Sequence, residues 1–166
     1  KYDRSSYYLA TKLPIWQVEK QEDVRKYCEE QLKKLDKDYI DFYLIHAMGR
    51  ERLEIVKKYH VIDELVKLRE EGKIRYIGFS FHDEYSVFKE IIELFDWDFC
   101  QIQYNYMDTD EQAGDQGYRL AEEKGIPMVI MEPVRGGSLA KFSDDIESMF
   151  KEVRPGKSIA SWALRW

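Results

Sequence analysis

Apolar and polar residues alternate along this chain with two different periods. Short, largely apolar runs occupy residues 7–13, 39–47, 74–81, 99–106 and 127–134. Runs of this length are typical of strands in a parallel sheet that is covered on both faces. Between them, apolar residues recur at helical spacing near 21–36, 61–68, 87–95 and 112–124. The pattern therefore predicts five strands that alternate with helices.

Glycine follows two of the predicted helices. Gly72 comes after the helix near 61–68, and Gly125 comes after the helix near 112–124. Glycine readily adopts the left-handed conformation at which many helices end. After the fifth apolar run we expect a glycine-rich turn "RGG", then a polar acidic stretch without a regular element, and a final helix within "SIASWALRW".

Strands that alternate with helices favour a parallel α/β architecture, either an open sheet or a barrel. No G-x-G-x-x-G motif follows a predicted strand, which disfavours an open dinucleotide-binding sheet. A complete TIM (β/α)8 barrel needs eight strands and about 250 residues. We therefore expect residues 1–166 to be a single domain of the TIM-barrel type with about five of the eight βα units.

Composition narrows the classes of partner. The net charge is -6, and Lys and Arg are interspersed with Asp and Glu, so we expect no nucleic-acid partner. No run approaches the about 18 apolar residues of a membrane span, and the first residues lack the apolar core of a signal peptide. Cys28 and Cys100 form no metal-binding pair, so we expect buried thiols, no metal site and a cytoplasmic location.

Polar residues at the ends of the predicted strands are the candidates for chemistry, because βα barrels place their active sites there. Lys12 ends the first strand and His46 the second. Neighbouring parallel strands lie about 4.8 Å apart, so both side chains are expected in one mouth. A lysine between apolar walls loses hydration, and its charge can stabilise an anion or lower the pKa of a hydroxyl. The neighbouring imidazole can orient a carbonyl oxygen.

Five segments carry a family resemblance. In order and spacing, "LATKLP", "DFYLIHAMG", "GKIRYIGFSFHD", "FCQIQYNY" and "VIMEPVRGG" resemble the aldo-keto reductases, most of all a bacterial branch related to members with a ferredoxin-like domain. The resemblance spans nearly the whole chain. It implies that the five predicted strands are strands 3 to 7 of the family barrel, and that the protein reduces a small aldehyde or ketone substrate with NADPH or NADH.

The resemblance also implies an active site of Asp, Tyr, Lys and His. Lys12 matches the family lysine, which lowers the pKa of the tyrosine that donates the proton, and His46 matches the histidine. The family aspartate and tyrosine lie well before the lysine, whereas Tyr2 and Asp3 lie too close to Lys12 to match them. We therefore expect the whole protein to be the enzyme and the 166 residues alone to be inactive.

Further residues match the family's contacts with nicotinamide. Ser80 matches the serine of a G-x-S-N turn, in which Phe81 replaces the asparagine and His82 is the candidate to compensate. Gln101 matches the glutamine beside the nicotinamide amide. Met131 occupies the position at which many members stack a tyrosine on the ring.

The resemblance places the pyrophosphate at the turn after the fifth strand. Arg135, Gly136 and Gly137 would border it, because backbone N–H groups at glycine can approach closely. A simple loop is the alternative interpretation of "RGG". The implied cofactor is NADP, with NAD as the alternative. An iron–sulfur cluster domain would belong to the whole protein, because this chain lacks the cysteine-rich motif.

Two other functions stay open at this point. The chain could be a non-catalytic partial barrel that forms a homo-oligomer through its outer strands, 7–13 and 127–134, because unpaired strand edges favour association. It could also be a barrel hydrolase that uses Glu132. That chemistry needs a second carboxylate about 5 to 9 Å away, for which Asp83 and Asp108 are the candidates.

Overall fold

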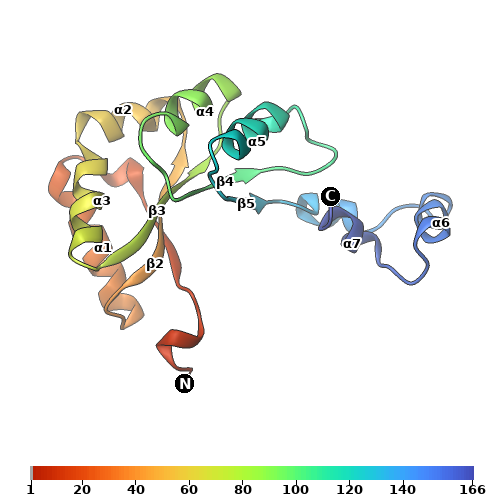
Figure 1. The fold of residues 1–166 in the computed structure, drawn as a ribbon, viewed down its shortest axis with the longest axis horizontal. Coiled ribbons are helices and arrows are strands. Elements are labelled where there is room, and N and C mark those ends of the chain that lie inside the picture. Colours follow the sequence, from red (N-terminus) through yellow and green to blue (C-terminus); the bar gives the residue numbers. More distant parts are fainter. Residues whose placement is uncertain (1) are drawn as a thin grey trace.

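Five parallel strands form one sheet in the computed structural model, which describes residues 2–166 (Figure 1). The strands are β1 (Ala10–Leu13), β2 (Ile40–Met48), β3 (Ile74–Phe81), β4 (Phe99–Gln103) and β5 (Met128–Met131). Their spatial order follows the chain order, and all four neighbouring pairs are parallel. Each connection therefore crosses over the sheet through a helix, as in a βα barrel.

The crossover helices are α1 (Gln21–Leu35), α2 (Arg50–Lys58), α3 (Val61–Glu70), α4 (Tyr85–Ile92) and α5 (Gly114–Glu123). The predicted glycine ends are confirmed, because Gly72 and Gly125 have φ of 76° and 68°. The sequence pattern missed α2. It also missed α6 (Asp144–Val153), where the acidic stretch was expected to be irregular. Acidic residues in the first turn of α6 complement the helix dipole and favour a helix there.

Three strands are shorter than their apolar runs predict. β1 begins at Ala10 rather than at Tyr7, and a short 3₁₀ turn at Arg4–Ser6 precedes it. β4 ends at Gln103, because the side chain of Asn105 accepts hydrogen bonds from the backbone N–H groups of Met107 and Asp108 and turns the chain. β5 ends at Met131, because the next residue has a φ of 55°.

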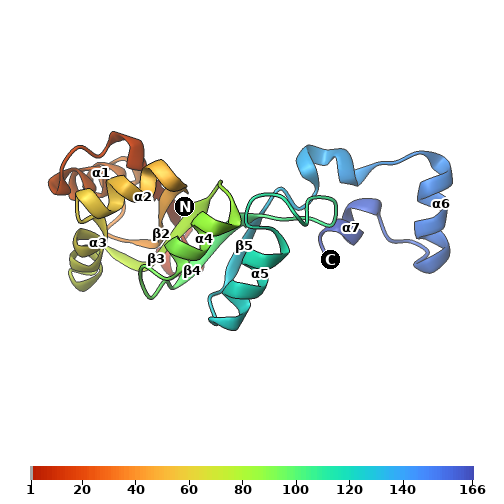
Figure 2. The same cartoon turned by 90° about the horizontal axis from the view of Figure 1, so that it is seen from above.

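Helices α1 to α5 cover one face of the sheet only (Figures 1 and 2). The buried core lies on that face and includes Tyr43, Ile77, Phe79 and Cys100. The opposite face also carries apolar residues, but Tyr76 and Val129 there are 44% and 48% exposed. The apolar runs predict strands that are covered on both faces, and in these residues helices cover one face. In a barrel the apolar residues of the second face line the interior instead.

The sheet is strongly curved. The Nζ atom of Lys12 on β1 lies 2.6 Å from the Oε1 atom of Gln101 on β4, although two strands separate β1 from β4. In a flat sheet these strands would lie about 14 Å apart, which is beyond the combined reach of the two side chains. The contact therefore requires the sheet to wrap around its uncovered face. This curvature gives the TIM-barrel type of fold that the sequence predicts.

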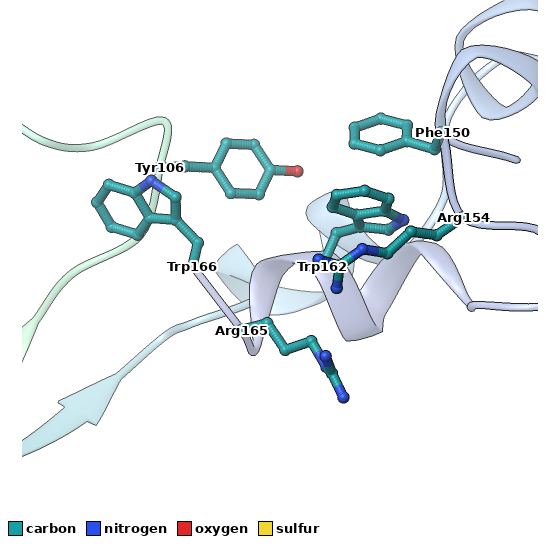
Figure 3. Close-up of a pocket in the computed structure, with 6 residues that line it drawn as sticks. All are labelled: Tyr106, Phe150, Arg154, Trp162, Arg165 and Trp166. Atoms are coloured by element: carbon teal, nitrogen blue, oxygen red, sulfur yellow. The ribbon is translucent and has the colours of Figure 1, made fainter. Parts of the chain in front are cut away.

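The segment after β5 extends away from the sheet (Figure 2). It contains a 3₁₀ segment at Arg135–Ala140, α6 and the predicted final helix α7 (Ile159–Ala163). Figure 3 shows a hollow of about 540 Å³ beside α7, with aromatic walls and two arginines. No helix within residues 2–166 is long and apolar enough to span a bilayer.

Candidate functional site

Lys12 places an ammonium group on the uncovered face of the sheet. Its nitrogen donates a hydrogen bond to the side-chain oxygen of Gln101 at 2.6 Å, and it forms no ion pair with the carboxylates of residues 2–166. Desolvation lowers the pKa of Lys12, as burial does for any cation. The ammonium group is thus positioned by a neutral amide and is not neutralised by a negative charge. It can therefore attract an anion or a hydroxyl oxygen.

His46 lies at the same end of the sheet. Lys12 is in register with Leu44, so His46 stands two residues farther along the neighbouring strand and on the same face. Its ring packs against Trp16, with ring centroids 5.0 Å apart. Desolvation lowers the pKa of His46, and the charges of Lys12, Arg52 and His82 lower it further. The imidazole is therefore neutral at pH 7 and can donate or accept a hydrogen bond.

Ser80 fixes the end of β2. Its buried Oγ accepts a hydrogen bond from the backbone N–H of Ala47 at 2.7 Å. Ala47 has a φ of 53°, and the register of β2 against β3 shifts between Ile45 and Met48. The hydroxyl thus supports the bulge that directly follows His46. It keeps one O–H for donation, as the predicted contact with a nicotinamide amide requires.

His82 lies at the rim, and Phe81 does not. The ring of Phe81 is buried against Phe88, with centroids 5.1 Å apart, so Phe81 faces the helices and cannot replace the family asparagine. Desolvation lowers the pKa of His82, whereas a hydrogen bond that its ring donates to Gln112 and the charge of Glu132 oppose this shift. His82 is therefore the side chain of this turn that can reach a ligand.

Gln101 and Met131 belong to the uncovered face. Gln101 pairs in register with Val129, and Met131 stands two residues beyond Val129 on the same strand, so all three side chains point the same way. The amide oxygen of Gln101 is occupied by Lys12. Its NH₂ group is thereby turned away from Lys12 and suits a carbonyl acceptor. Met131 offers an apolar thioether where an aromatic ring would stack.

The predicted "RGG" turn is a 3₁₀ segment with two left-handed glycines. Gly136 and Gly137 have φ of 61° and 96°, and apart from the residues adjacent in the chain no atom lies within 4 Å of where a Cβ would be. Their backbone is thus open to a ligand. Arg135 is less free, because its Nε lies 3.2 Å from Oδ2 of Asp108. Asp108 is itself buried and accepts a hydrogen bond from Asn105 at 2.8 Å.

The carboxylates proposed as partners of Glu132 have structural contacts. Asp83 accepts hydrogen bonds from the backbone N–H groups of Arg50 at 2.7 Å and Glu84 at 2.8 Å, and so caps α2. Asp108 is held by Asn105 and Arg135. These contacts do not support the hydrolase alternative. Residues 2–166 also contain no cluster of three or more potential metal ligands.

Two residues of the site were missed from the sequence. Trp16 lies in the short 3₁₀ turn Ile15–Gln17 that directly follows β1 and Pro14. Arg52 lies in the first turn of α2, its guanidinium 5.5 Å from the centre of the Trp16 ring. A prediction of α2 would have indicated Arg52, because the first turn of a helix after a barrel strand faces the active-site end.

A curved parallel sheet with a lysine, a histidine and open glycines at the carboxyl ends of its strands defines part of a βα-barrel enzyme. The Aldo/keto reductase family model matches residues 1–166. The chain therefore belongs to the aldo/keto reductase family, as its motifs predict.

Known relatives agree with this assignment. Glyoxal reductase of Bacillus subtilis is 28% identical over 143 residues, which are 83% of this chain and 46% of that protein. An aldo/keto reductase structure from Brucella melitensis is 27% identical with a TM-score of 0.75, and the match covers 99% of this chain and 60% of that one. An aldo/keto reductase from Klebsiella pneumoniae in complex with NADP and acetate is 23% identical, with a TM-score of 0.77 over 98% and 56% of the two chains. The chain thus spans about half the length of these relatives.

Proposed function

We propose that the protein containing this chain is an NAD(P)H-dependent oxidoreductase that reduces small aldehydes or ketones, and that residues 1–166 form one domain that is part of its barrel. The observation that carries the proposal is the desolvated Lys12, without a counter-ion in residues 2–166, at the same sheet end as a neutral His46. Membership of the aldo/keto reductase family supports the same chemistry. The names of the B. subtilis and K. pneumoniae relatives support carbonyl reduction and NADP.

Each residue has a distinct role in this proposal. NAD(P)H, when bound, supplies the hydride that adds to the carbonyl carbon, while the carbonyl oxygen receives a proton. Lys12 lowers the pKa of the hydroxyl that donates this proton. His46, kept neutral by its surroundings, donates a hydrogen bond to the carbonyl oxygen and fixes its direction.

The remaining residues would hold the cofactor. Ser80, Gln101 and His82 contribute polar groups for the nicotinamide amide, and Met131 packs against the ring. The open backbone of Gly136 and Gly137 receives the pyrophosphate, with Arg135 beside it. NADP is preferred over NAD by analogy with the K. pneumoniae enzyme.

The isolated chain of 166 residues should not catalyse this reduction. The family aspartate and tyrosine have no counterparts on its five strands, and Lys12 is held by an amide rather than a carboxylate. The location that we propose is the cytoplasm, whose reducing conditions suit the free, buried Cys28 and Cys100. Burial raises the pKa of both thiols to about 12, so they are inert.

The test uses the intact protein and the isolated chain side by side. NADPH fluorescence reports binding, and the loss of NADPH absorbance with benzaldehyde or glyoxal reports turnover. We expect the intact protein to bind and consume NADPH, and the isolated chain, once shown by circular dichroism to be folded, to consume none. An intact protein that neither binds NADPH nor reduces either aldehyde would contradict the proposal. Light scattering on the same samples tests the homo-oligomer alternative.

A further inference from the structure

Arg52 is a fixed cation at the mouth of the barrel. One of its guanidinium nitrogens, Nη1, donates to the backbone oxygen of Ala47, the residue after His46. The guanidinium also lies over the indole of Trp16, 5.5 Å from the ring centre. These two contacts fix both the position and the plane of a side chain that otherwise has considerable rotamer freedom.

No carboxylate in residues 2–166 forms an ion pair with Arg52. Its neighbour Arg50 differs, because it is paired with Glu90. The acids that line the adjoining hollow, which is about 400 Å³ in volume, are Glu51 and Asp83. Asp83 caps α2, and Glu51 is exposed to solvent. The remaining N–H groups of Arg52 are thus free to bind an external anion.

The groups around Arg52 form a local excess of positive charge. The charges of Lys12 and Arg52 both lower the pKa of His46, beyond the effect of desolvation, so two permanent cations act on the same imidazole. Trp16 contacts both the His46 ring and the Arg52 guanidinium. Cations that repel one another in this way destabilise the empty site, and a bound anion relieves the repulsion.

We propose that Arg52, oriented by Ala47 and Trp16, binds the carboxylate of an anionic carbonyl substrate, so that the preferred substrate class is oxo acids rather than neutral aldehydes. This inference rests on the proposed reductase function. The carbonyl would lie beside Lys12 and His46, and the carboxylate at Arg52. A charge-assisted hydrogen bond of this kind contributes enough to change kcat/KM about tenfold or more.

The experiment compares straight-chain ω-oxo carboxylates of four to six carbons with neutral aldehydes of the same length, using the intact protein and NADPH. We expect kcat/KM for at least one oxo acid to exceed that of its neutral partner at least tenfold, and to fall as salt is added. Arg52→Gln should remove this preference. Arg52→Lys should keep part of it, because the charge remains while the planar fork is lost.

Arg50→Gln is the matched control, since it removes an arginine from the same helical turn whose charge Glu90 already neutralises. It should leave the preference for the oxo acid unchanged. Neutral aldehydes reduced as well as oxo acids, or a preference that survives in Arg52→Gln, would overturn the inference and leave the reductase function standing. Failure to reduce either kind of substrate would instead refute the proposed function, and this inference with it.

Discussion

The two ends of the five-strand sheet differ in how their charges are paired. At the amino end, the buried carboxylate of Asp41 lies 2.5 Å from Arg4 and 2.9 Å from Arg75, and it accepts the backbone N–H of Leu9 at 2.8 Å. At the carboxyl end, Lys12 and Arg52 donate hydrogen bonds to neutral oxygens and form no ion pair within residues 2–166. Charged groups are thus paired at the amino end of the sheet, whereas Lys12 and Arg52 at the carboxyl end are not.

This difference suits the amino end of the sheet to stabilising the fold and the carboxyl end to binding a ligand. Paired and hydrogen-bonded charges at the amino end hold β1, β2 and β3 together, because Asp41 connects all three strand starts. Unpaired charges at the carboxyl end contribute nothing comparable to folding, and together with desolvation, which is the larger cause, they lower the pKa of His46. Barrel enzymes divide their two ends in the same way, with stability at the bottom and chemistry at the top. The four predictions below test this division.

The largest effect is expected for Lys12→Met in the intact protein. Losing the charge that lowers the pKa of the proton donor should reduce kcat/KM for benzaldehyde by about a hundredfold or more. The free energy of unfolding should not fall, because the variant removes a desolvated cation without an ion-pair partner in the described residues. Lys33→Met, on the exposed side of α1, is the control. An Lys12→Met protein that retains normal kcat/KM would exclude the proposed role.

Asp41→Asn should give the largest loss of stability. Removing one member of a buried ion pair costs about 3–5 kcal/mol, but Arg75 is 51% exposed and can be hydrated again, so we expect about 2 kcal/mol. Urea denaturation of the variant measures this loss. Asp38→Asn, at an exposed position before β2, serves as the comparison and should change little. Equal stability of the two variants would show that the amino-end ion pairs do not stabilise the sheet.

The two ends should also respond to pH in different ranges. The pKa of Asp41 is lowered, chiefly by its hydrogen bonds with Leu9 and Arg4 against an opposing effect of burial. Its stabilisation is therefore complete above the unfolded value of about 4 and is lost as pH falls below it.

The pKa of His46 is also lowered, so the unfolded chain binds this proton more readily. Stability is therefore lost as pH falls through the unfolded value of about 6.5. We expect His46→Gln to reduce the pH dependence of unfolding between pH 7.5 and 5, with the remainder due to His82, whose pKa is also lowered, and to leave the loss below pH 4 intact. A wild-type slope that persists in His46→Gln would contradict this assignment.

The smallest effect is expected for Ser80→Ala. The backbone N–H of Ala47 loses its acceptor, which costs about 1 to 2 kcal/mol. Because this bond supports the bulge after His46, NADPH binding and kcat/KM should weaken as well. The exposed Ser86→Ala on α4 controls for loss of a hydroxyl. Weaker cofactor binding without any loss of stability would mean that Ser80 contacts the cofactor but does not support the bulge.

The sequence predicts the sheet and much of the site, because both depend on local patterns. Five apolar runs indicate the five strands, and Lys12 and His46 are recognisable as polar residues at strand ends. The contact between Lys12 and Gln101 was not predictable in the same way, because it depends on the curvature of the whole sheet. The ion pair between Arg135 and Asp108 was likewise not predictable, because it joins two loops that follow neighbouring strands.

Arg52 illustrates a different reason for failure. Helix α2 has only nine residues, and its two buried apolar positions, Leu53 and Val56, are too few to give a clear helical period. Without the helix, an arginine in a charged segment resembles any surface residue. Its role depends on Ala47 and Trp16, which come from the end of β2 and from the turn after β1.

The most direct test of the division between the two ends is the rate of NADPH-dependent benzaldehyde reduction per folded molecule of the intact protein, measured for Lys12→Met and Asp41→Asn together. The fraction folded comes from the urea curves of the same preparations. We predict that Lys12→Met is folded and nearly inactive, while the folded fraction of Asp41→Asn reduces benzaldehyde at the wild-type rate. Loss of this rate in folded Asp41→Asn, or its retention in Lys12→Met, would contradict the account.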